Sequence, residues 1–516
     1  MISDKNNSNK TYTNQAKRIS SNALVLFVRI LIITIINLYS IRFVLKGLGN
    51  ENYGIFSAVV GVVMTCSCVF PILAVSVQRF YSFTMGRNEW SRLRDIFSAS
   101  INIIIISLII ILILLETLGL YFINTELQIP LNRIDESILI FHLAIITFAF
   151  SYLQIPYSAA VFAHEDMNIY AYISCCDSIL KLAAALLIGI VPIDELVFYG
   201  CALSFISCCT WICYFLVSRR YKECRYKKIS ENGIYKKLLS FSGWTIYGGI
   251  ANIGMIQGNN ILLNIFFGPI VNAAFGIANN IYNTFTSLSN SMILSFRPQM
   301  IRSYAAGDYK YLNMLFSANN KFIIYVLCAI AIPLIFEMDF IMKLWLDDAS
   351  MDMINFSRLF IIFTIILTLH NPITIIIQAS GNIRNYHLIV ETIMILCLPI
   401  TWILFRMKYP PYIAFVSMII LCVLAHAIRL IILKHNYKCF NMKSYICSII
   451  VPAGFIVLII GIGTWLIHDA IASDIIRFIC VTSFSLFTTF LLAYFIGLSN
   501  KERFFVNSLL KKILKR

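Results

Sequence analysis

The sequence has few charged residues for its length. Of its 516 residues only 13% are Asp, Glu, Lys or Arg, whereas 59% are hydrophobic and the mean hydropathy is +0.81. A water-soluble domain typically carries about 25% charged residues. The composition therefore excludes a soluble globular protein and predicts a protein embedded in a membrane.

Several chemical signatures are also missing. None of the 15 cysteines forms a CxxC pair and no histidine cluster accompanies them, so we interpret them as small hydrophobic residues, not as a disulfide framework or metal site. No GxxxxGK[ST] loop is present, which excludes ATP as the direct fuel. The longest outer connection, about 124–136, has no room for a catalytic domain. We therefore expect neither an enzyme nor a cofactor, and coupling to Na⁺ or H⁺ stays open.

Long apolar runs dominate what is present. Runs such as 101–115 do not alternate in polarity, which excludes a membrane barrel, and a helix needs roughly 20 apolar residues to cross the hydrocarbon core. We expect an all-α polytopic membrane protein with about fourteen spans. They lie at approximately 20–43, 53–78, 96–123, 137–163, 168–192, 195–218, 240–266, 270–296, 319–346, 354–380, 387–407, 411–433, 445–468 and 474–497.

The net charge of +16 reflects the placement of Lys and Arg in alternate connections. Thirty of the 41 fall in the segments predicted to lie on the inner side, with the largest groups in 219–237 and in the C-terminal tail, and the positive-inside rule then places both termini in the cytoplasm. We expect a multi-pass protein of the bacterial cytoplasmic (inner) membrane, with no nucleic-acid partner. Residues 505–514 place apolar and basic side chains on opposite helical faces, which predicts an amphipathic helix on the inner leaflet.

An internal repeat relates spans 1–6 to spans 7–12. Four blocks match in the same order with a slowly drifting offset: Tyr53-Gly54 with Phe275-Gly276, Gly86 with Gly307, Phe97 with Phe316, and Pro156 with Pro372. Six spans is an even number, so the copies are parallel repeats. The predicted domains are an N-terminal lobe 1–218, a basic linker 219–239, a C-terminal lobe 240–434, two extra helices in 435–499 and the basic tail 500–516.

These features resemble a known family. The chain resembles the multidrug/oligosaccharidyl-lipid/polysaccharide (MOP) flippase superfamily in the Tyr53-Gly54 turn, the six-plus-six repeat and the span GWTIYGGIANIGMIQGNNILLNIFFG. Within this superfamily it resembles the polysaccharide-exporter or Wzx-type O-antigen branch, and the resemblance implies a MATE-like fold. The resemblance implies a transporter that flips an undecaprenyl-diphosphate-linked oligosaccharide outward by alternating access, for lipopolysaccharide or other surface polysaccharide. Its partners would be the lipid-linked oligosaccharide, membrane lipid and a glycan polymerase or glycosyltransferase complex.

Such a substrate calls for cations, hydrogen-bonding groups and movable helices. Charges deep in a membrane are costly, so Arg29 and Lys181 are our candidates for a cationic site, although Asp177 lies one turn from Lys181 and could simply neutralise it. We expect Arg42, Arg358, Arg429 and Arg477 to reach water from span ends. The candidates for sugar binding, or alternatively for helix–helix contacts, are Asn259, Asn260 and Asn283. The candidate hinges are Pro156 and Pro372; the candidate coupling-ion residues are Asp177, Glu391, His370 and His426.

Two other functions compete with this prediction. A cation-coupled multidrug or metabolite exporter of the same superfamily would favour acidic residues deep in the lobes, and here the one deep acid, Asp177, shares its turn with a lysine. A membrane enzyme such as a glycan polymerase or ligase would carry catalytic groups on a sizeable outer loop, which the sequence lacks.

Overall fold

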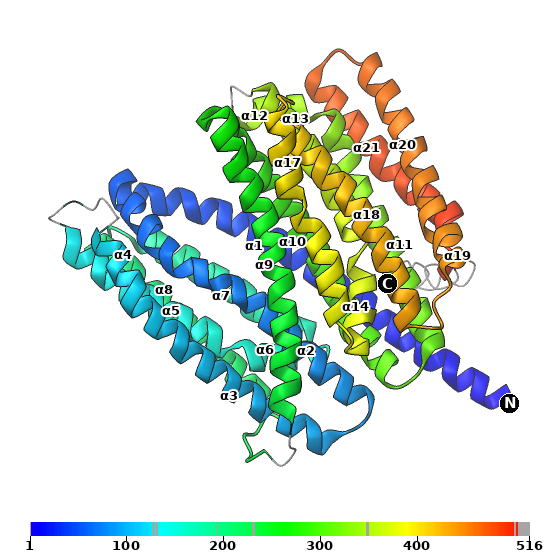
Figure 1. Ribbon diagram of the computed structural model, residues 1–516, viewed down its shortest axis with the longest axis horizontal. Helices are drawn as coiled ribbons and strands as arrows, with labels where there is room; N and C mark the ends of the chain where they lie inside the picture. Colours follow the sequence, from blue (N-terminus) through cyan, green and yellow to red (C-terminus); the bar gives the residue numbers. More distant parts are fainter. Residues whose placement is uncertain are drawn as a thin grey trace. The chain divides into compact units, whose positions relative to one another are not determined.

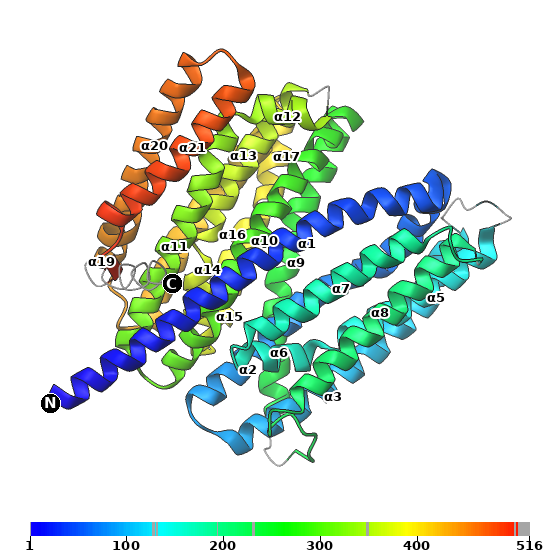
Figure 2. The same ribbon diagram turned by 180° about the vertical axis from the view of Figure 1, so that it is seen from behind.

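The structure is a computed structural model in which nearly every described residue is helical (Figures 1 and 2). It describes residues 2–125, 130, 133–192, 194–229, 233–346, 350–499 and 502–503, and no strand occurs among them. The all-α fold class is therefore confirmed. The predicted amphipathic helix at 505–514 lies outside the described residues.

The chain divides into two compact units, residues 20–249 and residues 250–516 together with residues 1–19. We call them the N-terminal and C-terminal units. The predicted linker 219–239 falls within the N-terminal unit, and α9 (Ile234–Phe267) crosses from one unit into the other.

Among its described residues the N-terminal unit is built from long helices, which the 3₁₀ turn η1 (Cys66–Cys68) and the π-helix η2 (Leu115–Gly119) interrupt. Its helices are α1 (Ile2–Thr65, from residue 20 onward), α2 (Val69–Gly86), α3 (Trp90–Leu114), α4 (Leu120–Thr125), α5 (Ile134–Leu153), α6 (Ile155–Ala163), α7 (Met167–Leu187) and α8 (Glu195–Ser218).

The C-terminal unit continues with α10 (Pro269–Ala305), α11 (Tyr309–Phe336), α12 (Met338–Leu346), α13 (Met351–Thr368), α14 (Asn371–Ser380), α15 (Arg384–Tyr386), α16 (Thr392–Ile395), α17 (Cys397–Arg406), α18 (Ile413–Asn436), α19 (Met442–Tyr445), α20 (Val451–Ala470) and α21 (Asp474–Leu492). Three π-helical segments interrupt it, at η4 (His387–Glu391), η5 (Ile446–Ile450) and η6 (Ala493–Gly497).

Eleven helical segments among the described residues are long and apolar enough to cross a membrane, and each overlaps one of the fourteen predicted spans, although Tyr309–Phe336 begins and ends ten residues before the predicted span 319–346. The other three predicted spans also form helices. The second is split between the apolar segment Asn52–Met64 and α2, and the seventh and eighth are α9 and α10. With 34 and 37 residues, α9 and α10 are long enough to cross. Asn, Gln and Gly residues dilute their apolar runs, which sets these helices apart from the eleven.

Turns and helix breaks repeat between the two units as the sequence predicts. Gly49 and Gly268 adopt positive φ values of 73° and 82° where the first helix of each repeat gives way to the second. A residue with a side chain is strained in this region, whereas glycine is not. The next turn has positive φ at Asn88 and Gly307, so the predicted pairing of Gly86 with Gly307 is wrong by two residues.

The two candidate hinge prolines occupy matching positions. Pro156 lies in the first turn of α6, immediately after α5 ends, and Pro372 lies in the first turn of α14, immediately after α13 ends. Proline is tolerated there because the first turn of a helix has no intrahelical partner for its N–H groups. Each proline therefore follows a break in its span, and its role as a hinge stays a prediction.

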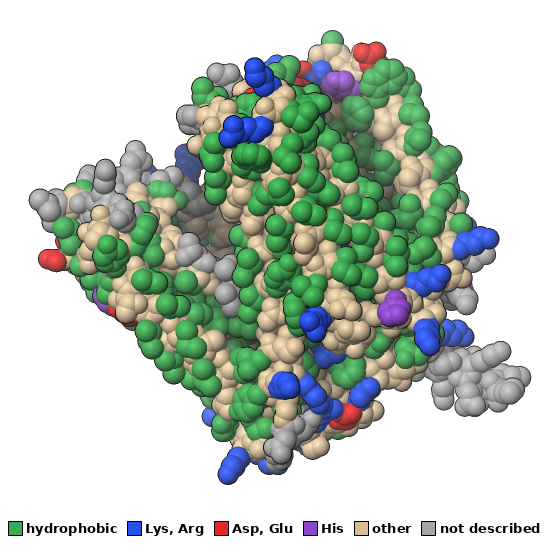
Figure 3. All heavy atoms as spheres, in the orientation of Figure 1, with side chains coloured by type: hydrophobic (Ala, Val, Ile, Leu, Met, Phe, Trp, Pro, Cys, Tyr) green, Lys and Arg blue, Asp and Glu red, His purple; other side chains and the backbone are tan. Residues whose placement is uncertain are grey.

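Aromatic side chains fill the interior of both units. In the N-terminal unit Phe148 stacks on Tyr152, with ring centroids 5.7 Å apart, and Phe70 lies against both. In the C-terminal unit Phe360 contacts both Phe275 and Phe415. Hydrophobic side chains are also widespread on the visible sides of the helices (Figure 3). Helices in lipid associate by close packing and internal polar contacts.

Internal ion pairs fix the last two helices to the C-terminal unit. Glu337, at the end of α11, has a fully buried side chain and pairs with Arg477 of α21 at 3.0 Å and with His468 of α20 at 2.8 Å. A further ion pair joins Arg358 of α13 to Asp339 of α12 at 2.5 Å.

The expectation that Arg429 reaches water is wrong, because its side chain is 2% exposed and donates to the hydroxyl of Tyr386.

Candidate substrate-binding surfaces

A charged pair lies midway along α7 in the N-terminal unit. The Oδ2 atom of Asp177 is 2.8 Å from the Nζ atom of Lys181 one turn later, and the hydroxyl of Thr210 on α8 donates to the other carboxylate oxygen at 3.2 Å. The Lys181 side chain is 40% exposed and that of Asp177 is 21% exposed. The pair is formed within one helix, as expected for opposite charges four residues apart. Asp177 therefore neutralises Lys181 in this structure.

Arg29 of α1 extends toward the same helix. Its Nε donates to the hydroxyl of Ser174 at 2.5 Å, and its guanidinium lies over the ring of Tyr170 at 4.3 Å from the centroid. Ser174 is four residues from Tyr170, so both lie on one face of α7. Among the described residues no carboxylate pairs with Arg29. Its charge is held by a hydroxyl and an aromatic face, which leaves it available to an anion.

These side chains form one surface, which we call the α1–α7 site: Arg29, Tyr170, Ser174, Asp177 and Lys181. Its formal charge is +1, because Asp177 cancels one of the two cations. A surface of this kind favours an anionic or neutral polar group over a cation. No group of three metal-ligating side chains occurs in the described part of the chain.

The C-terminal unit has a polar surface of a different kind on α10. The side of this helix that packs into its unit is apolar, with buried Phe275, Ala278 and Phe285. The opposite side is exposed and carries residues at helical spacing, which we call the α10 face: Gly276, Asn280, Asn283, Thr284, Ser287 and Asn290. A lipid-facing helix has the reverse distribution, with apolar side chains on its exposed side.

Other helices of the same unit show what a lipid-facing surface looks like here. The exposed side of α20 carries Phe455, Leu458 and Ile462, and that of α21 carries Ile479 and Phe487. Amide side chains facing hydrocarbon would lose their hydrogen bonds to water, which costs several kcal/mol per unsatisfied group. The α10 face is therefore suited to water or to a polar ligand.

The equivalent helix of the N-terminal unit has a matching exposed side made of small residues. Gly54, Ser57, Ala58 and Gly61 are exposed, and Gly54 corresponds to Gly276 in the repeat. A Cβ atom built at Gly54, Gly61 or Gly276 meets nothing within 4 Å. The second helix of the N-terminal unit thus presents a side of small residues from Gly54 to Gly61, before the exposed Met64, and that of the C-terminal unit presents a polar side.

The predicted asparagine contacts separate into different environments. Asn259 is fully buried, and its amide donates to the carbonyl of Met255 at 2.8 Å and to the sulfur of Cys397 at 3.6 Å, so it joins α9 to α17. Asn260 is half-buried, and its side-chain oxygen has no partner among the described residues. Asn283 lies on the α10 face. Asn260 and Asn283 are in the C-terminal unit, whereas Arg29 and Lys181 are in the N-terminal unit.

The candidate coupling residues of the C-terminal unit lie around Arg429. His370, His426 and Glu391 come from three separate spans, and Arg429 interacts electrostatically with each of them. His426 also lies 3.3 Å from the hydroxyl of Tyr445. The structure therefore brings these three residues together, and Asp177 belongs to the other unit.

Sequence reasoning missed part of both surfaces. Tyr170, Ser174 and Thr210 are uncharged, and nothing in the sequence marks them as partners of a charge on another helix. The α10 face did leave a signal, because its polar residues recur every three or four positions, which is the spacing of one side of a helix.

The fold is similar to that of solved membrane transporters. A multidrug resistance MATE family transporter of the MOP superfamily, in an outward-facing conformation, matches with a TM-score of 0.69 at 15% identity, over 83% of this chain and 97% of that one. A MATE protein in the bent conformation matches with a TM-score of 0.70 at 14% identity, over 82% of this chain and 96% of that one.

A third solved structure also has a similar fold. It is a MOP superfamily transporter from Pyrococcus furiosus, described as having a binding pocket of reverse polarity that suggests a different function, and it matches with a TM-score of 0.70 at 14% identity, over 82% of this chain and 96% of that one. No family model matches the sequence, and no curated protein is similar to it in sequence. At these identities the similarity shows the fold.

Proposed function

We propose that this protein is a membrane transporter that exports its substrate by alternating access from the bacterial cytoplasmic membrane, with both termini in the cytoplasm. The observation that carries the proposal is the fold match, which covers 82–83% of this chain and 96–97% of solved transporters. The matching turns, helix breaks and exposed second helices of the two units support it, because alternating access uses paired repeats of this kind.

Our first candidate for the substrate is a lipid-linked oligosaccharide bearing a diphosphate, as in the Wzx-type O-antigen flippases. The α1–α7 site supports it, since Arg29 offers an uncompensated cation and the site has a formal charge of +1. The α10 face supports it as well, since amides and hydroxyls suit sugar hydroxyls. An inside-negative membrane potential favours outward movement of each negative charge by about 2.3 kcal/mol per 100 mV.

The second candidate is a multidrug or metabolite exporter, and the comparisons favour it. Two of the solved structures described above are MATE proteins, one of which is named as a multidrug resistance transporter. The paired Asp177 is the feature of this chain that suits a cationic substrate, provided that it can release Lys181 and accept a substrate cation or a proton instead.

One reconstitution experiment separates these candidates. Purified protein is placed in liposomes and offered, in separate samples, a fluorescent polyprenyl-diphosphate oligosaccharide and a cationic dye, and transport of each is measured with an inside-negative potential. Arg29→Ala is compared with Arg29→Lys, which keeps the charge, and with Arg42→Ala, which removes an exposed arginine from the same helix.

The first candidate predicts transport of the diphosphate lipid, its loss in Arg29→Ala, partial recovery in Arg29→Lys and no change in Arg42→Ala. Transport of the dye alone, with Asp177→Asn inactive and Arg29→Ala active, would establish the exporter instead. Transport of neither substrate by well-folded protein, together with no potential-dependent flux of other sugars or drugs, would contradict the assignment as a transporter.

A further inference from the structure

The linker between α8 and α9 lies along the side of α3. We use "the linker" here for residues 219–229. Arg94 donates to the carbonyl of Arg225 at 3.0 Å, the backbone N–H of Lys227 donates to Ser98 at 3.0 Å, and the hydroxyl of Tyr226 donates to Asn102 at 3.2 Å. The three contacts on α3 are four residues apart, so the linker follows one face of this helix for about 12 Å.

A second group of contacts holds the start of the linker against the end of α6. The ring of Tyr221 stacks on that of His164, with centroids 3.9 Å apart, and its hydroxyl donates to Asp166 at 2.6 Å. His164 also hydrogen-bonds Glu223. Burial acts to raise the pKa of Glu223, but the hydrogen bond with His164, a backbone hydrogen bond and the charge attraction to His164 together outweigh it and hold the pKa below its ordinary value. The carboxylate therefore stays ionised and is engaged within the unit.

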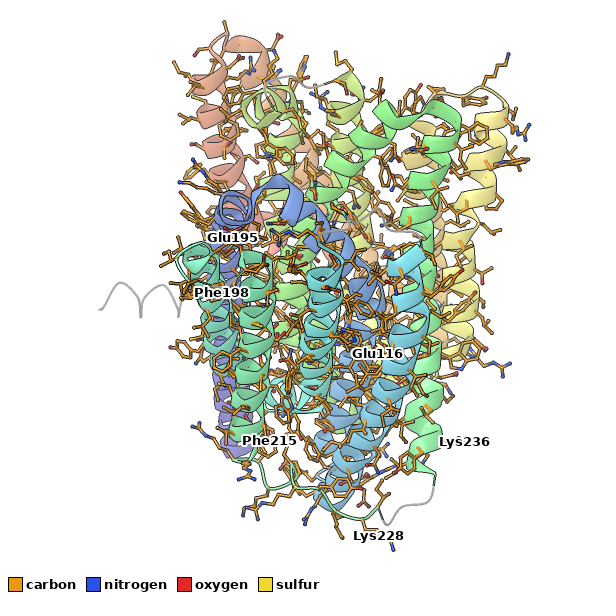
Figure 4. The ribbon with its side chains drawn as sticks, turned by 90° about the vertical axis from the view of Figure 1, so that its left-hand side faces the viewer. Glu116, Glu195, Phe198, Phe215, Lys228 and Lys236 are labelled. Atoms are coloured by element: carbon orange, nitrogen blue, oxygen red, sulfur yellow. The ribbon has the colours of Figure 1, made fainter. Side chains whose placement is uncertain are left out.

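In contrast to Glu223, the basic side chains of the linker are exposed. The linker contains one acidic residue, the inward-facing Glu223, and six basic residues that are all exposed: Arg219, Arg220, Lys222, Arg225, Lys227 and Lys228. Figure 4 shows Lys228 at the same end of the unit as Phe215, opposite Glu195 and Phe198. Folding of the linker thus separates the charges and leaves a continuous basic outer surface, which we call the basic face.

The residues beside the basic face are of the kind that is found at a membrane interface. Tyr226 and Tyr235 are 60% and 38% exposed, and both hydrogen-bond Asn102. Tyrosine is enriched where a protein meets the headgroup region. The exposed apolar side of α3 begins immediately beyond, at Ile105 and Ile106, about one helical turn from Asn102. Lys227, whose backbone contacts Ser98, is therefore about two turns from this apolar side, and Arg225, beside Arg94, about three turns from it.

We propose that the basic face binds the headgroups of anionic phospholipids in the leaflet beside it. A connection that served only to set topology would need its charges but would not need to be fixed along α3 at headgroup height. The contacts to Ser98, Asn102 and His164 fix it there. This proposal is independent of which substrate the protein transports.

The test measures lipid binding to the purified full-length protein in neutral detergent, by counting bound lipids in native mass spectrometry during titration with phosphatidylglycerol or phosphatidylcholine. The test variant is Arg225→Gln/Lys227→Gln/Lys228→Gln. The matched control, Lys434→Gln/Lys438→Gln/Lys443→Gln, removes the same charge from exposed positions next to α18 and α19 that the sequence places on the same side of the membrane. A third variant, Arg225→Lys/Lys227→Arg/Lys228→Arg, keeps the charge.

Wild-type protein should prefer phosphatidylglycerol. Each cation near an anionic surface contributes about fivefold, so the test variant should bind phosphatidylglycerol roughly 100-fold more weakly, while the control and the charge-retaining variant bind as wild type does. Raising the salt from about 0.1 M to 1 M should also remove the preference.

Three results would overturn the proposal. They are unchanged binding by the test variant, an equal loss in the Lys434/Lys438/Lys443 control, and displacement of the lipid by inorganic pyrophosphate at similar concentration, which would indicate a site for soluble phosphate. Thermal unfolding in phosphatidylcholine should be the same for all variants, because each substituted side chain is exposed.

Discussion

Replacing Arg29 with alanine should separate substrate binding from folding. In the folded protein Arg29 makes one hydrogen bond, to Ser174, and one cation–π contact, with Tyr170. A hydrogen bond to a charged group stabilises by about 1.5–3 kcal/mol and a cation–π contact by about 0.5–2 kcal/mol. Against this, an arginine within a span costs about 2.5–3.5 kcal/mol on insertion scales. The two sides nearly cancel, so Arg29→Ala should change the stability little.

The loss of affinity for an anionic substrate in Arg29→Ala is not offset by any opposing free-energy change. Removing the cation removes at least one charge-assisted hydrogen bond to the substrate, worth about 1.5–3 kcal/mol, which corresponds to roughly 10- to 150-fold in affinity. Arg29→Lys keeps the charge but loses the planar group that stacks on Tyr170, so its affinity should lie between those of wild type and Arg29→Ala.

The assay is the concentration dependence of transport in liposomes, measured together with thermal unfolding of the same preparations. We expect a raised KM for the diphosphate lipid in Arg29→Ala at an unchanged unfolding temperature. An unchanged KM would refute a substrate-binding role for Arg29. A protein that fails to fold would show instead that the contacts with Ser174 and Tyr170 outweigh the cost of the buried charge.

Three further predictions concern other parts of the two units. Asn283→Leu combined with Asn290→Leu should lower transport at least tenfold without lowering the unfolding temperature, because the α10 face contacts water or substrate; a more stable and fully active variant would argue for a lipid-facing helix. In a double-mutant cycle of Asp177→Asn and Lys181→Gln, unfolding should give a coupling energy of about 0.5–1 kcal/mol, because both side chains are partly exposed; zero coupling would show that the pair does not stabilise α7. Asp194→Asn should cost about 0.5 kcal/mol at pH 7, because Asp194 caps α8 and pairs with Arg133 at 2.5 Å, and asparagine keeps the cap but loses the charge of the pair. Burial acts to raise the pKa of Asp194, but these hydrogen bonds hold it below the ordinary value of 3.8, so the difference from wild type should be complete above that pH and shrink as the pH falls below it; a difference independent of pH would show that the charge is not involved.

The repeat could be predicted from the sequence because its markers act locally. Gly49 and Gly268 are needed wherever the chain turns through positive φ, and Pro156 and Pro372 interrupt a helix in any surroundings. The two-residue error at Gly86 arose because the equivalent turn uses Asn88, which also tolerates the left-handed conformation. The number of spans was harder to establish, since α9 and α10 are the helices that polar residues make least apolar.

The site could be predicted only in part because the sequence gives composition, not direction. Asn259 and Asn260 are neighbours, yet one is fully buried and the other half-buried, because adjacent residues on a helix point about 100° apart. Arg429 looks like an arginine near a span end, but its partner Tyr386 lies on another span, so its burial depends on tertiary contacts that no local pattern encodes.

Transport by the proposed route requires that the α10 face contacts water inside the membrane. Asn283→Cys and Asn290→Cys would be labelled in intact membranes with a hydrophilic maleimide, in a background whose native cysteines are replaced, and compared with Leu458→Cys and Phe487→Cys on the apolar sides of α20 and α21. We predict rapid labelling at the two α10 positions and almost none at the other two. Labelling at positions 283 and 290 as slow as at 458 and 487 would contradict the account.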